Sequence, residues 1–194
     1  MIGKKILALF KESKKSYLSV EELASFSGAN RSSLKVTLSR LVKQKSLIRL
    51  LHGYYALPDR NPDLEQIAIE LEYPAYLSLE YALAIHGILS QTPSRLTLIT
   101  KKRSAEHKTS TGIVLEFSHI KPSLFFGYEI KGQTQIARPE KALLDTLYLI
   151  GLGKRKLDIS GLDTDKLNKN LIKKWLKLYP PSTARLIASL AILG

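Results

Sequence analysis

Over the first thirty residues, apolar positions recur at helical spacing and are separated by short polar connections. In residues 2–10 apolar side chains alternate with lysines, which predicts an amphipathic first helix. After a polar connection over residues 11–17, Ser19 is a natural N-cap for a second helix that has glutamates in its first turn and ends near Gly28. The residues expected on the buried side of this second helix are Val20, Leu23, Ala24 and Phe26.

A third helix is predicted to begin at a cap, Asn30 or Ser32, and to run to about Gln44. Its leucines, Leu38 and Leu41, fall within about 40° of Leu34 on an ideal helix, which predicts a buried stripe. The rest of the helix surface carries basic, hydroxyl and small apolar side chains and no acidic one, a composition that suits phosphates and base edges in a major groove. Its candidate DNA-contacting residues are Arg31, Ser32, Lys35, Val36, Ser39, Arg40 and Lys43.

Two strand-like runs flank the dipeptide His52-Gly53, where glycine permits the positive φ of a tight hairpin turn. Three helices followed by a hairpin are the element order of a winged helix-turn-helix domain, which we expect over residues 1–58. Arg49 and His52 are the candidate DNA contacts on the hairpin, or wing. Small three-helix domains with a hairpin also serve as protein-docking modules, so both kinds of partner stay open at this point.

The polar, proline-flanked connection after residue 58 predicts a domain boundary, followed by a mixed α/β domain over residues 63–194. Ser78 is expected to cap one of its helices, and Pro139 suits the first position of another. The predicted fold class is therefore α+β, a winged helix-turn-helix followed by a mixed α/β domain with a helical tail. Helices are predicted over 63–71, 79–89, 139–150, 165–178 and 182–193, and strands over 96–100, 113–117, 125–130 and 134–137.

The net charge of +13 is unevenly distributed along the chain. Residues 1–58 carry +8, residues 59–150 carry −1, and residues 151–194 carry +6. Two basic ends around a near-neutral middle suggest that the ends face a polyanion, with solubilising surface charge as the alternative. Within the middle, basic residues at a strand end are candidate phosphate contacts or a solvated loop: Lys101, Lys102 and Arg103.

Several other chemistries find little support in the sequence. No cysteine is present, so disulfides and thiolate metal sites are excluded, and the four histidines lack the paired spacing of zinc ligands. We expect no cofactor and no membrane segment, and a cytoplasmic protein. Glu140 and Lys141 are expected as surface charges in the first turn of a helix, and Asp145 as a buried partner of a backbone or basic group. A nuclease built around Asp145 is the enzymatic alternative.

Three stretches of the chain resemble the AbiEi antitoxins. They are His52–Leu57 at the end of the winged helix, Tyr76–Ile88 at the opening of the second domain, and Ile136–Asp145 as that domain's later signature. The resemblance implies a transcriptional autorepressor in a toxin–antitoxin operon, whose partner gene encodes a nucleotidyltransferase-like toxin. It also implies that the winged helix binds inverted repeats in the promoter and that the second domain assists binding and antitoxicity.

In such systems, described as type IV, antitoxin and toxin need not touch. A dimer on DNA is expected, because two-fold operators usually require two protomers. The basic segment over residues 154–177 would then be a second DNA surface. The alternative is an antitoxin that neutralises its toxin by direct protein–protein binding. The resemblance assigns no catalytic residue.

Overall fold

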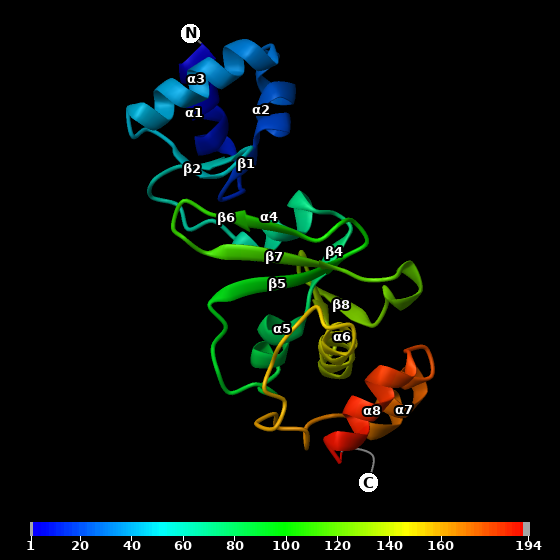
Figure 1. Ribbon diagram of the computed structural model, residues 1–194. Coiled ribbons are helices and arrows are strands. Elements are labelled where there is room, and N and C mark those ends of the chain that lie inside the picture. Colours follow the sequence, from blue (N-terminus) through cyan, green and yellow to red (C-terminus); the bar gives the residue numbers. More distant parts are fainter. Residues whose placement is uncertain (1, 192–194) are drawn as a thin grey trace. The chain divides into compact units, whose positions relative to one another are not determined.

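A computed structural model describes residues 2–191, and the chain divides into two compact units (Figure 1). Unit 1 consists of Met1–Ile67 with Lys108–Ile113, and unit 2 of Ala68–His107 with Val114–Gly194. Helix α4, Leu64–Leu71, contains the point of division. Helices and sheets both contribute, in agreement with the predicted α+β class.

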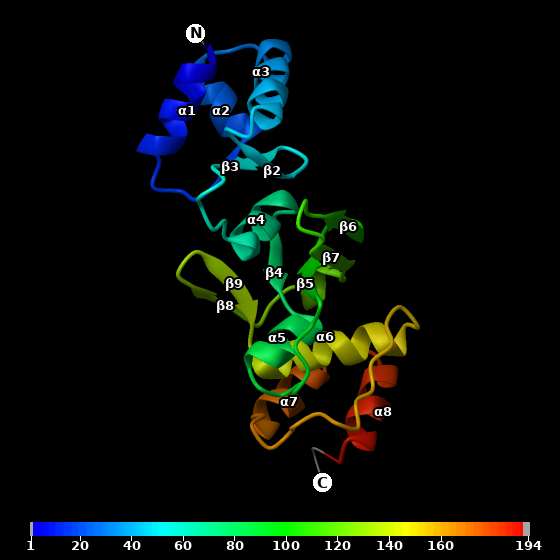
Figure 2. The ribbon, with the colours of Figure 1, turned by 90° about the vertical axis from the view of Figure 1, so that its left-hand side faces the viewer.

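Unit 1 has the predicted order of three helices and a hairpin, with one additional strand (Figures 1 and 2). Its small antiparallel sheet has the order β1-β3-β2, and β1 pairs Leu18 with Tyr55. Strand β1 was not predicted, because two residues are too few to show a periodic pattern. The elements are α1 Ile2–Glu12, β1 Leu18–Ser19, α2 Val20–Ser27, α3 Arg31–Lys43, β2 Ile48–Leu51 and β3 Tyr54–Ala56.

Local capping sets where the helices of unit 1 begin and end. Ser19 and Glu22 form a capping box at the start of α2, in which Ser19 Oγ accepts from the Glu22 amide at 3.1 Å. The Ser19 amide donates to the Glu22 carboxylate at 2.8 Å. Gly28 ends α2 in the left-handed region with φ 67°, where glycine is favoured. Asn30 caps α3 by accepting from the Ser33 amide at 2.8 Å, which decides between the two predicted caps.

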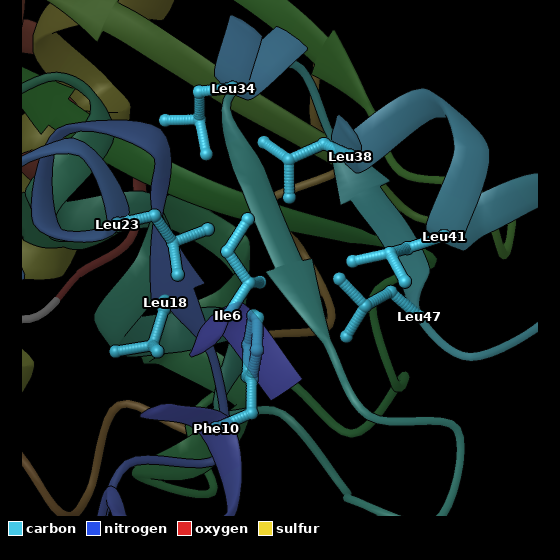
Figure 3. Close-up of a cluster of buried hydrophobic side chains, with 8 residues drawn as sticks. All are labelled: Ile6, Phe10, Leu18, Leu23, Leu34, Leu38, Leu41 and Leu47. Atoms are coloured by element: carbon cyan, nitrogen blue, oxygen red, sulfur yellow. The ribbon is translucent and has the colours of Figure 1, made fainter. Parts of the chain in front are cut away.

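The core of unit 1 is a cluster of eight buried side chains that point toward one another (Figure 3). It joins all three helices to the sheet, and the predicted leucine stripe of α3 supplies three of its members. The predicted burial of Phe26 is wrong, because this side chain is 58% exposed. Val20, Leu23 and Ala24 cover about 100° of the helix, and Phe26 falls about 60° outside that arc. The cluster is Ile6, Phe10, Leu18, Leu23, Leu34, Leu38, Leu41 and Leu47.

The capping box makes the stability of unit 1 depend on pH. Burial raises the pKa of Glu22, but hydrogen bonds from Lys15 and from Ser19 outweigh it and hold that pKa below its ordinary value. The ionised Glu22 carboxylate therefore stabilises unit 1 fully above the ordinary glutamate pKa of about 4.3. This stabilisation is lost as the pH falls through the lower pKa that Glu22 has in the folded protein. We expect Glu22→Gln, which keeps the capping hydrogen bonds but cannot ionise, to flatten the fall in urea midpoint between about pH 5 and pH 3. Parallel pH profiles for the two proteins would contradict this role.

Unit 2 is built on a mixed six-stranded sheet of order β6-β7-β5-β4-β9-β8. Strand β4 runs antiparallel to β5 and parallel to β9, while β5 runs parallel to β7. Helices α5 and α6 lie together on one side of the sheet, and α7 and α8 pack against α6 (Figures 1 and 2). The elements are β4 Ala75–Leu77, α5 Leu79–Ile85, β5 Arg95–Thr100, β6 Ala105–Lys108, β7 Val114–His119, the 3-10 helix η1 Pro122–Leu124, β8 Tyr128–Lys131, β9 Thr134–Ala137, α6 Pro139–Gly151, α7 Lys169–Leu176 and α8 Pro181–Ser189.

The main departures from the predicted elements of unit 2 concern short segments. Strand β4 was missed because its three residues are all buried and show no alternation. Strand β6 was missed because it is short and rich in charged and polar residues. Helix α5 ends at Ile85, since a turn follows instead of the predicted continuation to residue 89. Helix α7 begins at Lys169 rather than 165, because Asn168 caps it. Helix α8 ends at Ser189, before the predicted end at residue 193, and residues 192 and 193 lie outside the described residues.

Candidate nucleic-acid interface

Helix α3 has a buried side and an exposed side that match the prediction from its sequence. Its three leucines and Thr37 are buried, and Thr37 satisfies its hydroxyl by donating to the Ser33 carbonyl at 2.8 Å. Asn30 fixes the first turn. All seven candidate residues on this helix are exposed. We call them the α3 face: Arg31, Ser32, Lys35, Val36, Ser39, Arg40 and Lys43.

The positive charges of the α3 face are not neutralised within the protein. Across residues 2–191, the ion pairs include none of its arginines or lysines. In unit 1, Lys15 pairs with Glu22 at 2.7 Å instead. Arg40 lies beside α1, because a β-carbon placed on Gly3 would be 3.5 Å from the Nη2 atom of Arg40. Arg40 is nevertheless exposed to solvent. Exposed cations without acidic partners attract a polyanion such as the DNA backbone.

The wing brings together the two residues predicted on it. Strands β2 and β3 form an antiparallel hairpin whose turn includes Gly53 at φ 85°, which requires glycine. Arg49 Nη2 lies 2.8 Å from His52 Nδ1, and both side chains are exposed. Because a guanidinium can only donate, Nδ1 accepts and a neutral His52 carries its proton on Nε2. The wing therefore presents an arginine and a histidine N–H donor side by side.

The third candidate segment, Lys101–Arg103, lies in unit 2 after β5 and is exposed. Lys101 Nζ sits 4.7 Å from the centre of the Phe125 ring, and Lys102 Nζ is 3.5 Å from the Glu72 carboxylate. Two of the three basic side chains thus already contact groups of unit 2. They differ in this respect from the cations of the α3 face.

Four of the seven lysines in residues 151–194 lie on α7 or at its C-cap. Ile172 is buried and Trp175 packs edge-on against Phe126 with ring centres 5.4 Å apart, which anchors the apolar side of α7. The exposed lysines of the helix and its cap take part in none of the ion pairs formed by the described residues. We call them the α7 lysines: Lys169, Lys173, Lys174 and Lys177.

Helix α6 carries two charged residues whose predicted surface position is wrong. Glu140 is 5% exposed and Lys141 is 0% exposed, because α6 is covered by α5 on one side and by α7 and α8 on others. Glu140 accepts from the Asn168 amide at 2.8 Å and so holds the chain at the start of α7. The expectation that Asp145 is a buried partner of a basic group is confirmed, since its carboxylate pairs with Lys141.

The pair is the centre of a buried polar cluster that joins β4, α6 and the segment after α7. The carboxylate of Asp145 also accepts from the hydroxyls of Tyr76 and Ser78, each at 2.9 Å, and of Tyr179 at 3.2 Å. Lys141 Nζ donates to Tyr179 at 2.9 Å. Ser78 therefore does not cap α5 as predicted, because its hydroxyl is used by Asp145.

This buried cluster suits a structural task better than a chemical one. Burial lowers the pKa of Lys141, and the neighbouring Asp145 opposes that effect. Burial also raises the pKa of Tyr76 and of Tyr179 well above the ordinary value. The side chains of Lys141 and Asp145 are 0% exposed and their polar atoms are bonded to one another, so a substrate has no access to them. Among residues 2–191, no group of three or more histidines and carboxylates is placed to hold a metal ion.

Comparisons with known proteins bear on the N-terminal part of the chain. Residues 4–58 match the family model described as a transcriptional regulator, AbiEi antitoxin, and this range contains the whole α3 face and the wing. No curated protein matches the chain. No helix within residues 2–191 has both the length and the apolar character needed to cross a membrane. The resemblance noted in the sequence is confirmed over residues 4–58, which are similar to the AbiEi antitoxin family of transcriptional regulators.

Proposed function

We propose that this protein is a DNA-binding transcriptional repressor that controls its own promoter and serves as the antitoxin of a toxin–antitoxin operon. The observation that carries the proposal is the α3 face, an acid-free exposed helix surface with unpaired cations. It lies within the segment that matches the family of transcriptional regulators. An exposed surface with only positive charge suits a polyanion such as the DNA backbone.

In the proposed complex α3 enters the major groove and the wing follows the adjoining backbone. Arg31, Lys35, Arg40 and Lys43 contact phosphates, while the small hydroxyls of Ser32 and Ser39 leave room for base edges. In the wing, Arg49 and the Nε2–H of His52 add phosphate contacts. Two protomers bind the two halves of an inverted repeat, as two-fold operators require.

The repressor half of the proposal is tested with a reporter gene fused to the promoter of this protein's own operon. Expression of the protein in trans should lower reporter output, and scrambling the inverted repeat should restore it. Equal output with and without the protein would contradict autorepression.

The antitoxin half is tested by co-expression with the neighbouring reading frame, which we expect to encode a nucleotidyltransferase-like toxin. Growth arrest by that frame alone should be relieved when this protein is present.

Size-exclusion chromatography of the two purified proteins distinguishes an antitoxin that acts without contact from one that binds its toxin. Independent elution supports an antitoxin that does not touch its toxin, whereas co-elution at about 150 mM salt favours direct neutralisation.

The α7 lysines are proposed to contact the phosphates of the same duplex. Replacing two of them by glutamate, Lys169→Glu with Lys173→Glu, should lower the slope of log K against log[salt] by about 2, close to 0.9 per lost phosphate contact. The matched control is Lys121→Glu with Lys131→Glu, which reverses two exposed charges of unit 2 outside α7. Fluorescence anisotropy on the promoter fragment gives both slopes. An equal change in the two variants would contradict a specific role of α7.

A further inference from the structure

One side chain of the α3 face, that of Val36, is apolar. Val36 is 70% exposed and lies on the side of α3 opposite its buried leucines. An exposed β-branched residue has a lower helix propensity than alanine and buries little apolar surface here. Its presence in the middle of the helix is thus unexplained by the stability of unit 1.

The surroundings of Val36 indicate what would cover it. On an ideal helix Ser32, Ser39 and Arg40 lie within about 60° of Val36, as does Lys43. The two serines are short, so Val36 projects between them, and the cations around it favour a strongly negative partner. A second copy of this chain would bring the same cations against one another, which disfavours self-association through this surface.

We infer that Val36 is a specificity-determining residue that contacts the 5-methyl group of a thymine in the major groove. This inference rests on the proposed function. Once the surrounding cations dock α3 against the phosphates, the residue at the centre of the face meets the base edges. Among the four bases, thymine alone presents an apolar group there, and apolar side chains recognise it by contact. The minor groove offers no equivalent group.

The test compares promoter DNA made with thymine and the same fragment made with deoxyuridine. Deoxyuridine lacks the 5-methyl group and keeps every hydrogen-bonding group of thymine. We expect the wild-type protein to bind the deoxyuridine fragment about fourfold more weakly for each contacted methyl, the size expected for one buried apolar carbon. Val36→Ala should show a clearly smaller difference in affinity between the two fragments, because it lacks both γ-methyl groups and keeps only the shorter Cβ.

Phe26→Ala is the matched control, since Phe26 is also an exposed apolar residue of unit 1 but lies on α2, outside the α3 face. It should keep the wild-type ratio of affinities for the thymine and deoxyuridine fragments. An effect of deoxyuridine on DNA shape would act equally on Phe26→Ala and on the wild type, so this control separates it from loss of the methyl contact. Single replacements of thymine then locate the contacted base.

An equal ratio of affinities for the two fragments in wild type and Val36→Ala would overturn the inference while leaving promoter binding intact. A change of sedimentation behaviour in Val36→Ala, with the ratio unchanged, would mean that a protein surface covers Val36 and would also overturn it. Failure of the wild type to bind the thymine fragment at all would remove the proposed function together with the inference.

Discussion

Asp145→Ala is expected to lower the free energy of unfolding of unit 2 by about 3–5 kcal/mol, the usual cost of breaking a buried ion pair. The substitution leaves the ammonium of Lys141 buried at 0% exposure without its counter-ion. It also removes the acceptor for the hydroxyls of Tyr76, Ser78 and Tyr179. Urea denaturation followed through the single tryptophan, Trp175 on α7, reports directly on this unit.

The double variant Lys141→Met with Asp145→Leu separates the charge effect from packing. Because it removes both charges together, its cost should be smaller than that of Asp145→Ala alone. Ser78→Ala removes one of the hydrogen bonds to the carboxylate and should cost about 1 kcal/mol. A loss below about 1 kcal/mol for Asp145→Ala would contradict the view that this cluster holds β4, α6 and the C-terminal segment together.

Arg40→Glu combined with Lys43→Glu should weaken binding to the promoter by about 100-fold or more, because each lost hydrogen bond to a charged phosphate costs about 1.5–3 kcal/mol and the new carboxylates repel phosphates. Both side chains are exposed and outside every ion pair among the described residues, so the fold should persist. Circular dichroism checks the fold, and a gel shift at about 100 mM salt measures the affinity.

The matched control for this pair reverses two other exposed charges of unit 1, Lys11→Glu with Lys14→Glu. It changes the net charge by the same amount without touching α3. If the two double variants lost affinity equally, binding would depend on overall charge and not on the α3 face.

Features governed by neighbouring residues in the chain could be predicted from the sequence. The start of α2 at Ser19 and the start of α3 depend on capping groups a few residues away. The exposure of the α3 face follows from the leucine stripe on the opposite side of the same helix. The hairpin follows from Gly53 between two runs of β-forming residues.

Features that depend on distant segments could not be predicted in the same way. Glu140 and Lys141 have the sequence context of a solvated first turn, and their burial follows from packing of α6 against α5, α7 and α8. Ser78 has the sequence of an N-cap, but its hydroxyl is taken by Asp145, 67 residues further along the chain.

Equilibrium binding of the wild-type protein to its own promoter fragment, measured across about 50–200 mM salt beside a scrambled fragment of equal length, is the most direct test of sequence-specific DNA binding by this protein. We predict a linear fall of log K with log[salt] on both fragments and an affinity for the promoter at least about 1,000-fold higher than for the scrambled sequence. Equal affinity for the two fragments, or binding that does not change with salt, would contradict it.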